Sequence, residues 1–422
     1  MRAAHWLLGL PNEPDVSRGV QFRDLKGEAQ DRKPVVMTTF VFTDEQQDLR
    51  EMVRRFLAEK SPVSEVRRLM ATEAGYDPAV WAQLGQLGLA GLTIPEEYGG
   101  AGCGPVEQLI VCEEMGAALL SAPYLASAVL AAGALLASGD AAAQADLLPA
   151  IASGETIATL AVPEDDGSWT PDEFRVTARR SADRYLLDGR KSFVLDGMIA
   201  DLILVAASSD DGPALFAVGG PGDGSAPGLS RQAMPTLDMT RRQAVLTFSG
   251  TPGRPVSQPG AAAEIVAQAM RGGMLALAAE QVGGAQRCLD MAVGYAKVRH
   301  QFGRAIGSFQ AIKHMCADML LEVESARSAA YHAAWAAADG AADLPLVASL
   351  AKAYCSEAYF RAAADNIQIH GGIGFTWEHD AHLYYRRAKS SELMLGTPSE
   401  HREIAATYLI DEPAGRSPAD AG

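Results

Sequence analysis

The sequence predicts a mainly helical α+β protein in which a helical segment, a β segment and a second helical segment follow one another. Three features predict this order. An amphipathic helical pattern begins at Thr43, eleven of the 41 glycines and seven of the 22 prolines fall between Gly189 and Gly260, and no proline occurs from Ala261 to Asp343. Glycine and proline favour the turns that join short strands, and their scarcity favours long helices.

The first helical segment starts with a capping-box pair, Thr43 and Gln46, which marks a helix N-terminus. Apolar residues then recur at the i, i+3, i+4, i+7 and i+8 spacing of one helix face, at Leu49, Met52, Val53, Phe56 and Leu57. We expect helices to continue to about Ser153, interrupted only by the turn-rich stretch 95–105.

The middle segment contains short β-prone runs separated by turn residues. These runs are Tyr185–Leu187, Leu202–Ala207, Leu215–Val218 and Val245–Phe248. Short strands joined by turns predict a small antiparallel sheet or a barrel.

The second helical segment is rich in Ala, Met, Leu, Glu and Gln. After Ser308, a plausible N-cap, one helical stripe follows at Phe309, Ile312, Cys316, Met319, Leu320 and Val323. This pattern predicts a helical bundle that extends to about Ile410.

These boundaries divide the chain into five parts. We expect a poorly ordered extension over 1–36, a helical domain over 37–157, a β domain over 158–260, a helical bundle over 261–410 and a polar tail over 411–422. The extension lacks helical or strand periodicity, and Met37 is a plausible natural start.

The composition excludes several classes of function. The chain has 422 residues and a net charge of −16, and an acidic field repels nucleic acid. The stretch from Leu119 to Leu136 is too rich in Ala, Ser and Gly, and too interrupted by Pro123, to be a membrane span.

Five scattered cysteines without a CxxC pair indicate reduced thiols in a cytoplasmic protein. His379 and His382 lack a third ligand, so we expect a solvated helix face there and no metal site.

A basic cluster stands out in this acidic chain, within the segment Tyr295–Gln310. Its cations are Lys297, Arg299, His300 and Arg304. Cations at a helix C-terminus are favoured by the helix dipole, so simple end-capping explains the cluster. Arginine also suits bidentate contacts with a pyrophosphate, and Phe302 could stack on a ring, so a binding site explains it equally well.

A glycine-bearing segment, Gln368–Phe375, contains Gly371, Gly372 and Gly374. Such glycines permit close approach of a ligand, but most segments of this kind are turns. The segment lacks the dinucleotide pattern GxGxxG, and no strand precedes it.

Taken together, these segments resemble the acyl-CoA dehydrogenase family, over about Phe42 to Leu409. The matching segments are Ile94–Gly102, Pro163–Ser168, Tyr295–Gly303 with Gln310, and Gln368–Phe375. The resemblance implies an N-terminal helical domain, a middle antiparallel β-barrel and a C-terminal four-helix bundle. It also implies FAD as the cofactor, bound across a subunit interface.

The resemblance also implies the FAD contacts. For the adenosine diphosphate half of a flavin held by a neighbouring chain, it implies Arg299, Gln301, Phe302, Gln310, Gln368, Gly371 and Gly372. For the isoalloxazine ring of the chain's own flavin, it implies the segments 163–168 and 193–195, with Glu164, Ser168 and Phe193. It also implies Thr397 of the late loop as a cofactor-binding residue.

The sequence departs from the family at both positions that supply the catalytic Glu. In the commoner subfamilies the Glu precedes the Gly-Thr of the late loop, where this chain has Leu395. In the others it lies on the first long bundle helix, where an ungapped count gives Gly273. A Thr that often donates a hydrogen bond to the flavin is replaced by Leu195. The reaction needs a carboxylate near the α-carbon of an acyl thioester, and neither usual base is present.

Two other carboxylates are candidates for a substitute base. Glu392 lies three residues before the usual loop position, although a solvated Glu is the simpler interpretation. Glu280 shares a helix face with Gly273, but two turns, about 10 Å at 1.5 Å per residue, put it too far away. The catalytic residue therefore stays unassigned.

Three hypotheses follow. The chain is an FAD-dependent acyl-CoA dehydrogenase that forms an α,β-enoyl thioester, or a catalytically silent partner that completes the FAD site of a sister chain, or a flavin oxidase or monooxygenase of the same fold. The resemblance implies an acyl-CoA substrate, a homo- or heterotetramer and an electron-transfer acceptor protein. Heteromeric pairs of this family act on bulky, steroid-derived acyl-CoAs in actinobacteria.

Overall fold

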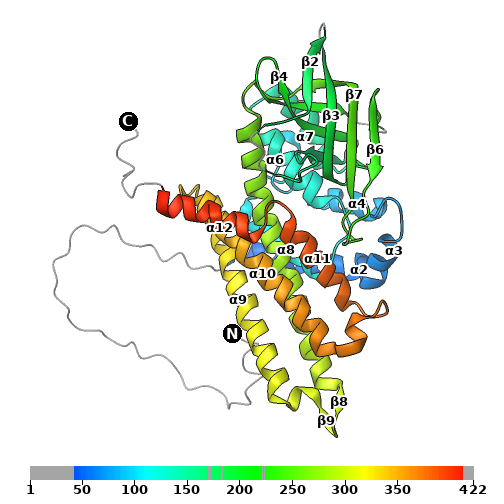
Figure 1. The fold of residues 1–422 in the computed structure, drawn as a ribbon, viewed down its shortest axis with the longest axis vertical. Coiled ribbons are helices and arrows are strands. Elements are labelled where there is room, and N and C mark those ends of the chain that lie inside the picture. The colour runs from blue at the N-terminus through cyan, green and yellow to red at the C-terminus, as the bar shows by residue number, and fades with distance from the viewer. Residues whose placement is uncertain (1–41, 170–172, 182–183, 221, 223, 412–422) are drawn as a thin grey trace, which may run out of the picture. The chain divides into compact units, whose positions relative to one another are not determined.

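The computed structural model describes residues 42–169, 173–181, 184–220, 222 and 224–411. The predicted extension over 1–36 and all but the first residue of the predicted tail lie outside the described residues. The part that begins at Phe42 is one compact unit. Its sheet lies at one end in Figure 1, and the long helices run away from it.

The first part of the unit is helical, as predicted. Its elements are α2 (Asp44–Lys60), α3 (Val63–Leu69), α4 (Pro78–Gln86), η1 (Glu96–Tyr98), α5 (Pro105–Ala117), η2 (Leu125–Ala131), α6 (Ala132–Ala137) and α7 (Ala141–Ala152). The capping box is confirmed, because the Gln46 amide donates to Thr43 Oγ1 over 3.3 Å and the Thr43 amide donates to Gln46 Oε1 over 3.0 Å. Helix α5 packs against α2 on one side and the long bundle helix α8 (Ala262–Val298) on the other.

The middle part is a seven-stranded sheet that closes on itself. Its strands are β1 (Ala158–Ala161), β2 (Thr177–Ser181), β3 (Arg184–Leu195), β4 (Leu202–Ser209), β5 (Ala214–Gly219), β6 (Leu229–Ala233) and β7 (Gln243–Pro255). All four predicted β-prone runs fall within strands. In the order β1-β4-β2-β3-β7-β5 the last strand also pairs with β4, which closes a ring and gives the predicted barrel; β1 flanks β4 outside this ring, and β6 pairs with β7. Because β4 pairs in parallel with both β1 and β2, the sheet is mixed rather than wholly antiparallel.

The last part is a bundle of four helices, as predicted. They are α8, α9 (Gln310–Ala338), α10 (Leu344–His370) and α11 (Ala381–Leu393). The hairpin β8 (His300–Gln301) with β9 (Arg304–Ala305), followed by η3 (Ile306–Ser308), joins α8 to α9, and η4 (Gly371–Phe375) joins α10 to α11. Helix α12 (Pro398–Ala406) and η5 (Thr407–Asp411) end the described chain.

One helix start differs from the prediction. Helix α9 begins at Gln310 and its N-cap is Phe309, not Ser308. The Ser308 hydroxyl donates to the carbonyl oxygen of Ala305 over 2.7 Å, which ties it to the preceding turn of η3.

Two glycines let the N-terminal helices pack closely against the bundle. A Cβ added at Gly283 on α8 would lie 1.8 Å from the carbonyl oxygen of Glu113 on α5, and one at Gly116 would lie 2.0 Å from that of Glu280. Any side chain at either position would push the two helices apart. This crossing fixes α8 against α5 and thereby places the residues of the central cavity described below.

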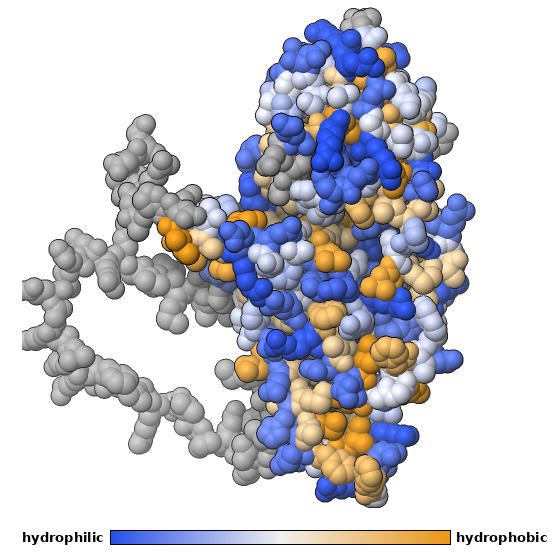
Figure 2. Space-filling model, in the orientation of Figure 1, coloured by the Kyte–Doolittle hydropathy of each residue, from blue (hydrophilic) through white to orange (hydrophobic). Residues whose placement is uncertain are grey.

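Apolar side chains also reach the surface at two places. Val298 and Phe302, at the hairpin end of the bundle, are 71% and 91% exposed, and Leu409 and Ile410 of η5 are exposed as well. Figure 2 shows apolar residues gathered at both places.

Candidate active site and cofactor seam

Two of the segments singled out in the sequence meet at the end of the bundle. Arg299 and Gln301 follow α8, Gly371 and Gly372 follow α10, and all four line one hollow of about 510 Å³. We call this hollow the seam. Gly371 has a φ of +66°, and no atom lies within 4 Å of a Cβ added at either glycine. The backbone of η4 is therefore open to a ligand.

The other residues predicted for this half of the flavin lie outside the lining of the seam. Phe302 stands at the tip of the hairpin, where its ring meets Phe309 edge-on at 6.1 Å between centroids. Gln310 and Gln368 are exposed on the first turn of α9 and the last turn of α10. The structure thus places all of these side chains at one end of the bundle without joining them in one pocket.

A second hollow, of about 310 Å³, lies between the sheet and α11. We call it the ring pocket. Phe193 lines it, together with Gly167, Trp169, Leu393 and Met394. Phe193 has a φ of +56°, an uncommon backbone conformation for an aromatic residue. Its walls are mostly apolar, which suits a flat ring system.

Three residues predicted to bind the cofactor, Glu164, Ser168 and Thr397, do not line this pocket. The Glu164 carboxylate is buried and accepts hydrogen bonds from the Arg175 and Val176 amides and from Lys191 Nζ, at 2.8, 3.1 and 2.9 Å. All three bonds end on Oε1, and Arg175 Nε lies 3.8 Å from Oε2, so the carboxylate links neighbouring parts of the β domain. Thr397 is the N-cap of α12, in a capping box with Glu400. Ser168 lies between two lining residues, and its amide donates to Asp166.

The two positions that the resemblance expects to carry the family's base, 273 and 395, are adjacent in space. A Cβ added at Gly273 on α8 would lie 2.9 Å from Leu395 Cδ1 and 2.6 Å from Leu130 Cδ2. Leu395 is fully buried, and its backbone has a φ of +58°. The space that a catalytic carboxylate would need is filled by hydrocarbon.

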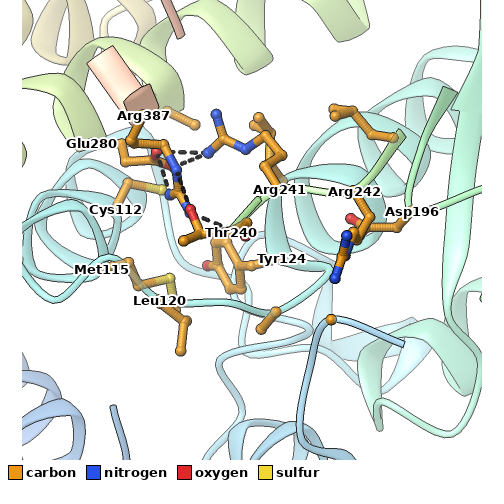
Figure 3. A pocket seen from close by; sticks show the side chains of 15 residues that line it. Cys112, Met115, Leu120, Tyr124, Asp196, Thr240, Arg241, Arg242, Glu280 and Arg387 are labelled. Atoms are coloured by element: carbon orange, nitrogen blue, oxygen red, sulfur yellow. Dashed lines mark hydrogen bonds and ion pairs between the residues drawn. The ribbon is translucent and has the colours of Figure 1, made fainter. Parts of the chain in front are cut away.

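One turn further along α8, at Ala276, lies a cavity of about 30 Å³, which we call the central cavity (Figure 3). Leu195 lines it from the end of β3, Ala276 from α8 one turn after Gly273, and Tyr124 from the segment before η2. A cavity of this size holds one or two water molecules. Ligand pockets for small molecules occupy roughly 300–1,000 Å³, so the central cavity is too small for an acyl chain.

Charged side chains close one side of the central cavity. Glu280 of α8 accepts from Arg241 Nη2 over 2.6 and 2.7 Å and from Arg387 Nη1 over 3.0 Å, as Figure 3 shows. Arg387 also donates to Asp238 over 2.8 Å. Burial acts to raise the pKa of Glu280, but the two guanidinium groups outweigh it and the pKa is lowered. Glu280 is therefore held as a carboxylate between two cations and cannot serve as a free base.

Two further polar groups face the same space. The Tyr124 hydroxyl is buried and has no hydrogen-bond partner among the described residues. Burial raises the pKa of Asp196 to about 7, although Arg241 and Arg387 partly oppose the shift. Asp196 directly follows Leu195 and has a φ of +51°.

Glu392, the other substitute base that the sequence suggested, is held by a neighbouring lysine. Its carboxylate accepts from Lys389 Nζ over 3.1 and 3.0 Å. Its side chain lines neither the ring pocket nor the central cavity.

Sequence reasoning missed several residues that shape these spaces. Arg241 and Arg387 belong to none of the segments that the sequence singled out, and arginines are usually solvated, yet both are buried. Trp169 follows a matched segment directly, and that adjacency is the only signal that could have found it. The expected solvated face at His379 and His382 is wrong for His382, which is buried against Trp377.

None of the described helices is long and apolar enough to cross a membrane.

The fold is that of the acyl-CoA dehydrogenases, and the chain belongs to the acyl-CoA dehydrogenase family. Models of its N-terminal and C-terminal domains match residues 43–155 and 263–410. FAD is the cofactor of this family, and its members oxidise acyl-CoA thioesters.

The similar proteins include curated acyl-CoA dehydrogenases and a solved complex. Acyl-CoA dehydrogenase IpdE2 from Mycobacterium tuberculosis is 37% identical, over 85% of this chain and 95% of its own. The crystal structure of the ChsE4-ChsE5 complex from the same organism matches with a TM-score of 0.81 and 30% identity, over 89% and 100% of the two chains. Butyryl-CoA dehydrogenase from Megasphaera elsdenii matches with a TM-score of 0.81 and 26% identity, over 88% and 100%.

The residues present fit FAD at two places. The seam offers the Arg299 guanidinium beside an open glycine backbone, which suits a diphosphate. The ring pocket offers Trp169 and Phe193, which suit a flat aromatic ring.

Proposed function

We propose that this chain is the non-catalytic subunit of a heteromeric acyl-CoA dehydrogenase, in which it completes the FAD site of a sister chain of the same family. The sister supplies the catalytic carboxylate and binds the acyl-CoA. When bound, FAD accepts the hydride from the β-carbon of the thioester. This chain contributes binding and orientation at the shared interface.

The observation that carries the proposal is the contact between Gly273 and Leu395. A dehydrogenase of this family must place a carboxylate against the α-carbon of its substrate. In this chain both positions that could provide it are occupied by groups without a proton to exchange, and their neighbours close the space between them. The central cavity of about 30 Å³ supports the same interpretation, because an acyl chain needs roughly ten times that volume.

The carboxylates near the cavity do not restore the activity. Glu280 is neutralised by two arginines, and Glu392 is bonded to Lys389. The Asp196 side chain lies beside Leu195 in a cavity that is closed to an acyl group.

The seam supports a role at a sister chain's cofactor. It stands at the surface end of the bundle, where Arg299 and Gln301 are exposed and Phe302 is 91% exposed. A hydrophobic ring beside an exposed guanidinium is typical of a surface that a partner covers. The ring pocket lies at the other end of the bundle, beside the sheet. A single flavin cannot occupy both the ring pocket and the seam, so the seam would contact a flavin whose ring is bound by another chain.

Co-purification tests the proposal. The chain should be produced alone and together with a second acyl-CoA dehydrogenase chain from the same organism, and the FAD content of each preparation should be measured by absorbance. We expect FAD and acyl-CoA-dependent dye reduction only in the two-chain complex. A yellow homomer that reduces the dye by itself would establish a self-sufficient dehydrogenase instead.

A further inference from the structure

The segment 392–397 connects α11 to α12 and touches both candidate sites. Leu393 and Met394 line the ring pocket, and Leu395 fills the space beside Gly273. Leu395 has a φ of +58° and Gly396 a φ of +98°, so the turn holds a left-handed backbone at two successive residues. Such a backbone persists when surrounding groups hold it.

A buried lysine lies directly beneath this turn. Lys352 of α10 is 0% exposed, and its Nζ donates to the carbonyl oxygens of Gly396 and Glu392 over 3.0 and 3.3 Å. A third hydrogen bond goes to Ser356 Oγ over 2.9 Å. Ser356 in turn accepts from Gln281 Nε2 over 3.0 Å, which links the lysine to α8. One amine therefore joins the turn to two bundle helices.

The turn is also held from the side. His401 Nε2 lies 2.9 Å from the carbonyl oxygen of Leu395, and a Cβ added at Gly396 would lie 2.8 Å from the same nitrogen. Glycine is therefore required at 396 both for its backbone angle and for the approach of the imidazole.

No carboxylate neutralises Lys352 by a direct bond in the described structure. The Glu392 carboxylate bonds to Lys389, and that of Glu400 bonds to Thr397. Burial lowers the pKa of Lys352 to about 7, with partial opposition from Cys355, Glu392 and Glu400, and the imidazole of His401 is a further titratable neighbour.

The number of donors depends on the protonation state. An ammonium group has three N–H donors, which match the three acceptors around Nζ, whereas a neutral amine has two. Loss of the proton therefore leaves one acceptor without its donor.

We propose that Lys352 is a positioning residue that holds the segment 392–397 in place, and that this hold weakens when its side chain loses a proton. The lysine thereby sets the wall of the ring pocket and the position of Leu395. The claim that this wall matters for a flavin rests on the proposed function. The claim that Lys352 holds the segment 392–397 does not depend on it.

Hydrogen exchange of the full-length chain tests the proposal, with rates corrected for the intrinsic pH dependence of exchange. The Met394 and Thr397 amides report on the turn, because each donates a hydrogen bond within the segment or to its flank. At pH 6 we expect Lys352→Met to speed exchange of these amides about tenfold, as expected for the loss of one to two hydrogen bonds. Lys313→Met, at an exposed lysine of α9, is the matched control and should leave them unchanged.

The unmodified chain provides the second measurement, which stands even if Lys352→Met does not fold. Its corrected exchange at the same amides should rise several-fold between pH 6 and pH 8.5. Lys352→Gln, which has two N–H donors and no charge, should show no such rise. Unchanged exchange in Lys352→Met, or a flat pH response in the unmodified chain, would overturn the proposal. Absence of FAD from the two-chain complex would overturn the proposed function and leave the exchange result as it is.

Discussion

Gly273 and Leu395 contact one another across the interface between α8 and the turn before α12, with 2.9 Å between Leu395 Cδ1 and a Cβ added at the glycine. By the resemblance to the family, these are the two positions expected to carry the catalytic Glu. Neither holds a carboxylate, and the side chains of Leu395 and Leu130 fill the space beside Gly273. The proposed function rests on this packing.

Gly273→Ala tests how tightly this contact is packed. A helix gains about 1 kcal/mol when Ala replaces Gly, but overpacking a core costs about 1–3 kcal/mol. Because the new methyl group would meet both Leu395 and Leu130, we expect a net loss of about 1 kcal/mol in the free energy of unfolding, measured by urea denaturation. The control is Gly272→Ala, one residue earlier and in open space, which should stabilise the chain. Equal stabilisation by both substitutions would contradict the packing described here.

Glu280→Gln tests the charged wall of the central cavity. The substitution removes the carboxylate that holds Arg241 and Arg387 and leaves two buried cations under-paired. Breaking a buried ion pair from one side costs about 3–5 kcal/mol, so we expect a loss of that size in urea denaturation. Glu264→Gln on the same helix breaks an exposed contact with Arg271 and should cost less than about 1 kcal/mol.

The effect of Glu280→Gln should depend on pH. The pKa of Glu280 is lowered in the folded chain, so its carboxylate contributes stability above its ordinary pKa of 4.5. That contribution is lost as the pH falls through the folded pKa. The difference in unfolding free energy between the unmodified chain and the variant should therefore be largest near neutral pH and shrink below pH 4.5.

For Asp196 the free energy of unfolding should depend on pH in the opposite direction, which Asp196→Asn tests. The folded chain raises the pKa of Asp196 from 3.8 to about 7, so between these values it binds a proton that the unfolded chain has released. The free energy of unfolding therefore falls as the pH rises through this window. Asn cannot titrate and tolerates a φ of +51°. The variant should gain stability relative to the unmodified chain from pH 4 to pH 7, and a constant difference would contradict the assignment.

Arg299→Ala tests the seam. In the two-chain complex it should weaken FAD binding about tenfold or more, because a charge-assisted contact with a diphosphate contributes about 1.5–3 kcal/mol. The measurement is FAD retained after dilution, followed by fluorescence. Arg304→Ala is the matched control, since Arg304 lies on the same hairpin with its guanidinium over the Phe309 ring at 4.2 Å. Equal loss of FAD in both variants would mean that net charge, not the seam, governs binding.

Local signals predicted the fold well. The Thr43 and Gln46 capping box and the four β-prone runs depend on residues close in sequence, and all appear where expected. The predicted N-cap of α9, Ser308, was wrong because its hydroxyl donates to the carbonyl oxygen of Ala305 in a turn that periodicity does not reveal. Parallel pairing of β4 with β1 and β2 depends on chain crossings that no local pattern encodes.

The candidate site was only partly visible in the sequence. Motif spacing pointed to Arg299, Gly371 and Gly372, which the fold brings to one hollow. The contact of Gly273 with Leu395 joins residues 122 positions apart, so only the tertiary structure shows that they share one space. The burial of Lys352 was equally hidden, although a lone lysine within the apolar run 347–355 is a signal that could have found it.

Anaerobic titration with acyl-CoA tests the central claim most directly. The chain alone and the two-chain complex, each supplied with FAD, should be titrated with a panel of straight-chain, branched and steroid-derived acyl-CoAs while flavin absorbance is recorded. We predict that the flavin is bleached only in the complex, and that the bleaching is lost when the sister's catalytic Glu is replaced by Gln. Bleaching in this chain alone would show that it oxidises acyl-CoA despite Leu395 and Gly273, and would contradict the account.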